Sequence, residues 1–133
     1  MHYEEVEFLR KRAKTFWEHG EYLMKLGKYD IASFHFEQAV QLELKAILLE
    51  YGGEKYRTHS IRKLLFAIGK LFGEEGKVQK FVREHRNDIK ALEDAYTDTR
   101  YEPVVYEDYD AKAVKKTAEM ILEFARSLVN LDE

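Results

Sequence analysis

The chain has 133 residues, of which 45 % are hydrophobic and 35 % are charged, and its formal net charge is −3. This length and composition predict one folded domain over residues 1–133, exclude a disordered chain and a membrane span, and argue against a protein that coats nucleic acid by bulk charge. The sequence contains no cysteine, which excludes disulfide bonds, a thiolate nucleophile, and zinc or iron–sulfur sites with cysteine ligands.

The first half of the chain predicts two long helices. Apolar residues recur on one helical face over residues 3–26, and Gly27 is the expected end of that helix. A second helix is predicted over residues 29–51, ending at Gly52 and Gly53. Its apolar residues cover more than one face, so we expect several other helices to pack around it.

The second half predicts one short helix and two long ones. The short helix spans residues 59–72, with Thr58 as its N-cap, and a long helix follows over residues 77–100. The last helix is predicted to begin at Asp110, its expected N-cap. No segment of the sequence shows the alternating pattern of a strand. We therefore predict an all-α fold, an antiparallel up-and-down bundle of four long helices plus one short helix.

Two segments carry a family resemblance. Residues 29–49 read YDIASFHFEQAVQLELKAILL, and residues 58–65 read THSIRKLL. Together with the later Asp94-Ala95-Tyr96, Thr99-Arg100-Tyr101 and Pro103, this order resembles the HEPN family, small helical proteins of prokaryotes that also occur as a terminal domain of sacsin, a large vertebrate chaperone. The resemblance implies an up-and-down helical bundle, frequent homodimers, and genomic pairing with a minimal nucleotidyltransferase in toxin–antitoxin-like systems.

The resemblance also indicates which residues would be catalytic if the protein were a ribonuclease. Some HEPN proteins are metal-independent ribonucleases that use an arginine and a histidine separated by four to six residues. Here the pair with this spacing is Arg12 and His19, away from the late helix in which the family places it, and no histidine follows Arg86 in that late helix. We therefore predict no catalytic residue. No histidine pair has the helical spacing of metal ligands, so we predict neither a metal nor a cofactor.

The candidate ligand site lies at the basic start of the short predicted helix. A helix N-terminus has free N–H groups that bind anions, and cations around His59 would add charge-assisted contacts to a phosphate. At the end of the next helix, an arginine could hold a phosphate while a tyrosine stacks on a base. The candidate ligand-binding residues are His59, Arg62, Lys63, Arg100 and Tyr101. The alternative is that these side chains cap helix ends or are solvated.

The residues and the resemblance together predict a HEPN-type binding module for a nucleotide or a nucleic acid. It would act with a minimal nucleotidyltransferase in a toxin–antitoxin-like pair, as a homodimer and without catalysis of its own. Two alternatives stay open: a metal-independent ribonuclease with a non-standard site at His59 or His85, and a pure interaction module with an interface of tyrosines 96, 101, 106 and 109. The charged start of the sequence predicts no secretory signal, so we expect a cytoplasmic protein, and its many Glu and Lys residues are typical of thermophiles.

Overall fold

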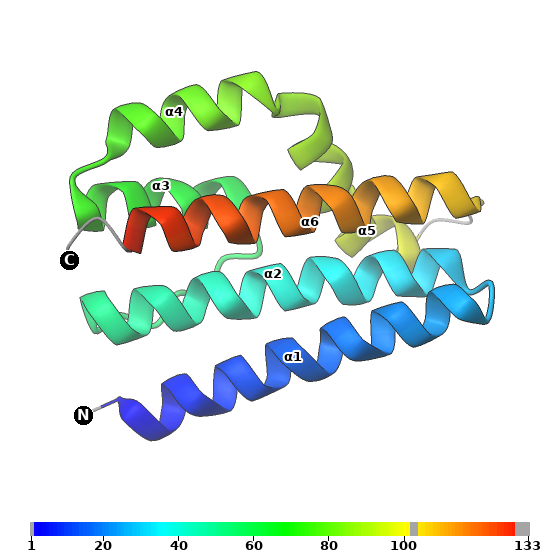
Figure 1. The fold of residues 1–133 in the computed structure, drawn as a ribbon, viewed down its shortest axis with the longest axis horizontal. Helices are drawn as coiled ribbons and strands as arrows, with labels where there is room; N and C mark the ends of the chain where they lie inside the picture. Colours follow the sequence, from blue (N-terminus) through cyan, green and yellow to red (C-terminus); the bar gives the residue numbers. More distant parts are fainter. Residues whose placement is uncertain (1, 102–103, 130–133) are drawn as a thin grey trace.

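The computed structural model describes residues 2–101 and 104–129. These residues form helices and no strand, which confirms the all-α prediction (Figure 1). The helices are α1 (Tyr3–Lys25), α2 (Tyr29–Gly52), α3 (Ile61–Phe72), α4 (Glu75–Glu84), α5 (Arg86–Tyr101) and α6 (Asp108–Val129). No helix within these described ranges is long and apolar enough to cross a membrane.

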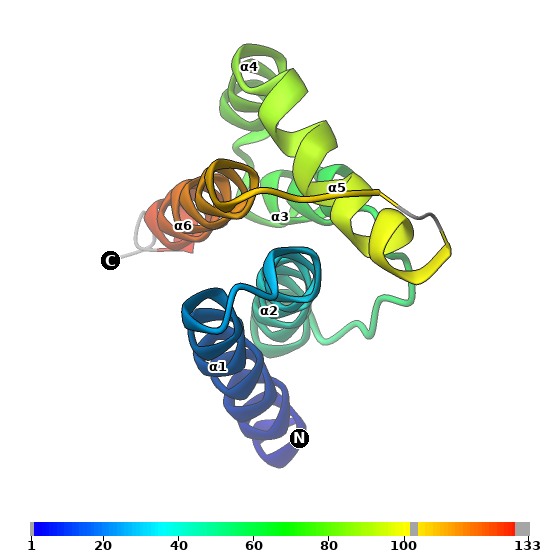
Figure 2. The ribbon, with the colours of Figure 1, turned by 90° about the vertical axis from the view of Figure 1, so that its right-hand side faces the viewer.

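Helix α2 lies at the centre of the fold, as its apolar residues predict. Helix α1 runs antiparallel beside it, and α3, α5 and α6 contact its other sides. Figure 2 looks nearly along α2 and α6 and shows α5 running across them. The core therefore forms around α2, where the buried Phe36 and Leu44 belong to one cluster with Leu65 of α3 and Ile121 of α6.

The helix predicted over residues 77–100 is in fact two helices, so the described residues form six helices rather than five. The chain bends at His85, whose φ of −115° and ψ of 26° are not helical. The bend lets Val78 of α4 pack against Gly69 of α3, while Ile89 of α5 enters the core. The apolar stripe continues across the bend, so the periodicity of the sequence does not reveal it.

Two predicted N-caps are wrong. Ser60, not Thr58, caps α3, because its Oγ accepts a backbone N–H of the first turn at 3.2 Å. Thr58 Oγ1 instead accepts the N–H of Ser60 at 3.1 Å, in the turn before the helix. Helix α6 begins two residues before Asp110, whose carboxylate accepts the Glu107 N–H at 2.8 Å. Asp110 therefore bonds back to the residue before the helix, as the acidic partner of a capping box does.

Gly20 allows α1 to approach α2 closely. A Cβ at this position would lie 2.8 Å from Phe36 Cε1, and Phe36 is fully buried. We predict that Gly20→Val lowers the free energy of unfolding by about 2 kcal/mol, because overpacking a filled core forces its neighbours apart. Urea unfolding followed by circular dichroism measures this change.

Gly76→Ala in α4 is the matched control for this substitution. Nothing lies within 4 Å of a Cβ built at Gly76, so alanine should leave the stability equal or slightly higher. A Gly20→Val variant as stable as wild type would contradict the close packing of α1 on α2.

Candidate functional site

The connection from α2 and the first turn of α3 carry His59, Arg62 and Lys63, the three candidate residues whose side chains the structure describes. Arg100 and Tyr101 belong to the last turn of α5, and their side chains lie outside the described residues. Ligand binding by either group stays a prediction.

Glu93 of α5 binds the start of α3. Its Oε1 accepts a hydrogen bond from Arg62 Nε at 2.9 Å and forms an ion pair with Arg62 Nη2 at 2.8 Å. Its Oε2 accepts from the Arg62 backbone N–H at 3.1 Å and from the Ser60 hydroxyl at 3.2 Å. The carboxylate thus occupies the helix N-terminus that the sequence suggested for a phosphate. An incoming anion must share Arg62 with Glu93, whereas Lys63 is exposed beside it.

Three aromatic rings from separate parts of the chain stack near this helix start. Tyr96 of α5 stacks on His59 with ring centroids 4.6 Å apart and planes 22° apart. Tyr96 also stacks on Phe34 of α2, at 6.1 Å and 27°. Phe34 and Tyr96 are half-buried, whereas His59 is exposed. The stack therefore presents the His59 ring to solvent beside the basic residues of α3.

A buried polar cluster lies on α2 under this stack. The Glu37 side chain is fully buried and accepts hydrogen bonds from Gln38 Nε2 at 2.9 Å and from Gln41 Nε2. Burial raises the pKa of Glu37 to about 7, and the nearby charge of Glu93 adds to the rise, while the two amide hydrogen bonds oppose it. Glu37 is thus a buried acid that gains or loses its proton near neutral pH.

Gln41 connects this cluster to His59. Its amide nitrogen donates to Glu37, and its Oε1 lies 3.3 Å from His59 Nδ1 and 3.5 Å from Lys45 Nζ. Because an amide oxygen only accepts, His59 must carry a proton on Nδ1 for this hydrogen bond. The cluster therefore fixes the orientation of the exposed ring. Sequence reasoning missed Glu37 and Gln41, although two polar residues four apart on an apolar helix are a usable signal.

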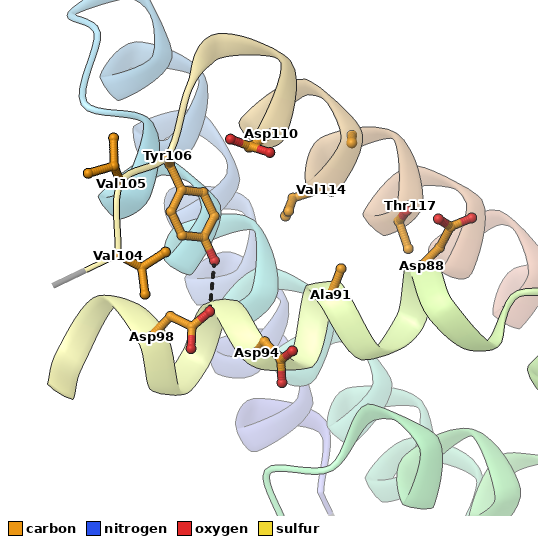
Figure 3. Close-up of a pocket in the computed structure, with 11 residues that line it drawn as sticks. Asp88, Ala91, Asp94, Asp98, Val104, Val105, Tyr106, Asp110, Val114 and Thr117 are labelled. Carbon is orange, nitrogen blue, oxygen red and sulfur yellow. Dashed lines mark hydrogen bonds between the residues drawn. The ribbon is translucent and has the colours of Figure 1, made fainter. Parts of the chain in front are cut away.

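Tyr96 and Tyr106, two of the tyrosines of the interaction-module alternative, lie in different places, and the Tyr101 side chain lies outside the described residues. Tyr96 stacks on His59, whereas Tyr106 lies in a separate cleft between α5 and α6 and donates to Asp98 at 3.4 Å (Figure 3). Burial, together with the charge of Asp98, raises the pKa of Tyr106 to about 12. This cleft has a volume of about 250 Å³ and contains four aspartates, so it repels anions: Asp88, Asp94, Asp98 and Asp110.

The histidines and the arginine considered for ribonuclease activity lie in three places. His85 lies at the bend between α4 and α5, with its ring centroid 4.7 Å from that of Phe81. Arg12 and His19 line a hollow on α1, where the Arg12 guanidinium lies 4.7 Å from the Phe8 ring centroid. The residues that line this hollow do not include His59. The structure therefore places Arg12 and His19 together in this hollow, whereas His59 and His85 do not line it.

Comparisons with known proteins agree with this fold. The HEPN domain family matches residues 6–128. The crystal structure of TT1696 from Thermus thermophilus is similar, with a TM-score of 0.70 and 24 % sequence identity, over 92 % of this chain and 97 % of that one. This likeness shows a shared fold. No curated protein sequence matched the chain significantly. Because the family match runs from the first turns of α1 to the last turn of α6, the chain belongs to the HEPN domain family.

Proposed function

We propose that this HEPN protein is a binding module for a nucleotide or a single-stranded nucleic acid, with the ligand at the start of α3. The observation that carries the proposal is the exposed His59 ring, stacked on Tyr96 and held by Gln41. Bases stack on aromatic side chains with little dependence on their sequence. A base can extend this stack on His59, and no catalytic step by this protein is proposed.

The charges around His59 support the same proposal. Arg57 and Lys63 are exposed and form no ion pair within the part of the chain that the structure describes. Both are close in sequence to the stacked ring, so a phosphate attached to a bound nucleoside has cations within reach. Arg62 contributes less, because Glu93 already holds its guanidinium. We therefore expect weak, reversible binding of a base with its phosphates.

Titration with ATP and with a short single-stranded RNA tests the proposal. We expect saturable binding of at least one of them. His59→Ala should weaken this binding about tenfold by removing the stacking surface. Lys63→Ala should weaken it and also reduce its salt dependence, because one phosphate contact is lost. Isothermal titration calorimetry at two salt concentrations measures both effects.

Lys116→Ala is the matched control, since Lys116 is an exposed cation of α6 outside the proposed site. It should bind both ligands as wild type does. An absence of saturable binding to ATP and to RNA would contradict the proposal. Cleavage of the RNA in EDTA, lost in His59→Ala, would instead favour the ribonuclease alternative.

The proposed protein partners are a second copy of the chain and a minimal nucleotidyltransferase, as membership of the HEPN family suggests. Exposed apolar side chains around the α1–α2 turn offer a surface for protein contact, since Tyr22, Leu26 and Ile31 are 61 %, 53 % and 39 % exposed. Sedimentation of the protein alone and with a nucleotidyltransferase encoded beside it should show a dimer and a 2:2 complex. If the protein sediments as a monomer both alone and in the mixture, it binds neither of the proposed partners.

A further inference from the structure

An apolar groove runs between α1, α2 and the connection that follows α2. Its volume is about 480 Å³, within the range of small-molecule sites. Its apolar lining comes from Phe8 and Leu9 of α1, Leu42 and Leu49 of α2, and Tyr56 of the connection. His59 does not line this groove, but the groove adjoins the proposed nucleotide site, because Lys45 and His59 both contact Gln41 Oε1.

Lys45 is a half-buried lysine of this groove that forms no ion pair among the described residues. Its side chain is half-buried, and its Nζ lies 3.5 Å from Gln41 Oε1, the far edge of hydrogen-bond distance. Among the described residues, no carboxylate oxygen lies within ion-pair distance of it. Burial lowers the pKa of Lys45, and the more distant charge of Glu37 offsets this only in part. The groove therefore holds a half-buried ammonium group beside apolar walls.

The other charged residues of the groove already have partners or face solvent. Lys55 forms an ion pair with Glu5 at the rim, and Glu4 is exposed. Glu4 and Glu5 would repel a highly charged ligand such as a polyphosphate. The groove is complementary to an apolar ligand that carries a single negative charge, which would lie at Lys45.

We propose that this groove binds a small elongated apolar molecule that ends in a carboxylate. The carboxylate pairs with the Lys45 ammonium, and the apolar part lies against Phe8, Leu42 and Tyr56. The groove would then be a second ligand site of the protein. Fatty acids and aromatic carboxylic acids share the required chemistry.

Calorimetric titration with decanoate, below its micelle concentration, tests this site. We expect saturable 1:1 binding of decanoate, and binding of decanol about tenfold weaker, because the alcohol forms no ion pair. Lys45→Met should abolish the preference for decanoate over decanol while keeping the fold, since it removes a half-buried charge and leaves a side chain of similar length. Lys116→Met, at an exposed lysine of α6 that does not line the groove, is the matched control and should keep the preference.

Phe8→Glu places a negative charge at the exposed mouth of the groove and should weaken decanoate binding more than decanol binding. A 13C NMR titration of the lysine Cε signals should show the pKa of Lys45 rising when decanoate binds. Equal affinity for decanoate and decanol, or a preference that survives Lys45→Met, would overturn the proposal. Dimerisation that Phe8→Glu abolishes, with no decanoate binding, would overturn it and assign the groove to a second copy.

Discussion

Glu93→Ala should lower the free energy of unfolding by about 2–3 kcal/mol and, at the same time, strengthen anion binding at the start of α3. The Glu93 side chain is only 14 % exposed, accepts three hydrogen bonds from Ser60 and Arg62, and forms an ion pair with the Arg62 guanidinium. Removing the carboxylate leaves the Arg62 guanidinium and the N-terminus of α3 without their hydrogen-bond acceptor. Because the Arg62 side chain is 40 % exposed, water recovers part of the loss. The freed Arg62 can then bind a phosphate.

Asp94→Ala is the control on the same helix. Asp94 forms an exposed ion pair with Lys90 at 3.2 Å, so its loss should cost less than about 0.5 kcal/mol. Urea unfolding and ATP titration of both variants separate the two effects. Equal losses of stability, or an ATP affinity that falls in Glu93→Ala, would contradict the role given to Glu93.

Glu37→Gln should remove a pH dependence of stability that the wild type shows between pH 4.5 and about 7. Burial raises the pKa of Glu37 from 4.5 to about 7, so over this range the folded chain holds a proton that the unfolded chain has lost. The stabilising contribution of this group is therefore complete below pH 4.5 and is lost as the pH rises to about 7. A shift of this size corresponds to about 3 kcal/mol.

Urea unfolding of wild type and Glu37→Gln at pH 5 and pH 8 measures this effect. The stability of the variant relative to wild type should rise by about 2–3 kcal/mol between these two pH values. Glu50→Gln, an exposed glutamate on the same helix, should follow the wild type. A difference between Glu37→Gln and wild type that stays constant with pH would show that the buried carboxyl does not hold a proton.

The ends of the first two helices could be predicted because glycine marks them directly. Gly27 and Gly53 have φ values of 74° and 70°, a left-handed conformation that favours glycine after a helix. The bend at His85 could not be predicted in this way. An apolar stripe reports which face of a helix is buried, and it stays continuous when the helix axis changes direction, so the stripe predicts one long helix where α4 and α5 lie.

The candidate site was predictable only in part, for a similar reason. The sequence places His59, Arg62 and Lys63 together because they are neighbours along the chain. It does not show that Glu93, 31 residues after Arg62, meets them across α3 and α5. Nor does it show that Tyr96 stacks on His59, since both contacts depend on the angle at which α5 crosses the fold.

An NMR titration of the histidine ring protons with ATP shows directly whether a base stacks on His59 at the start of α3. The His59 ring signals should shift in a saturable manner as adenine stacks on the ring, while the His85 signals stay in place. ATP binding that saturates without moving the His59 signals, or shifts that never saturate, would contradict the proposed site.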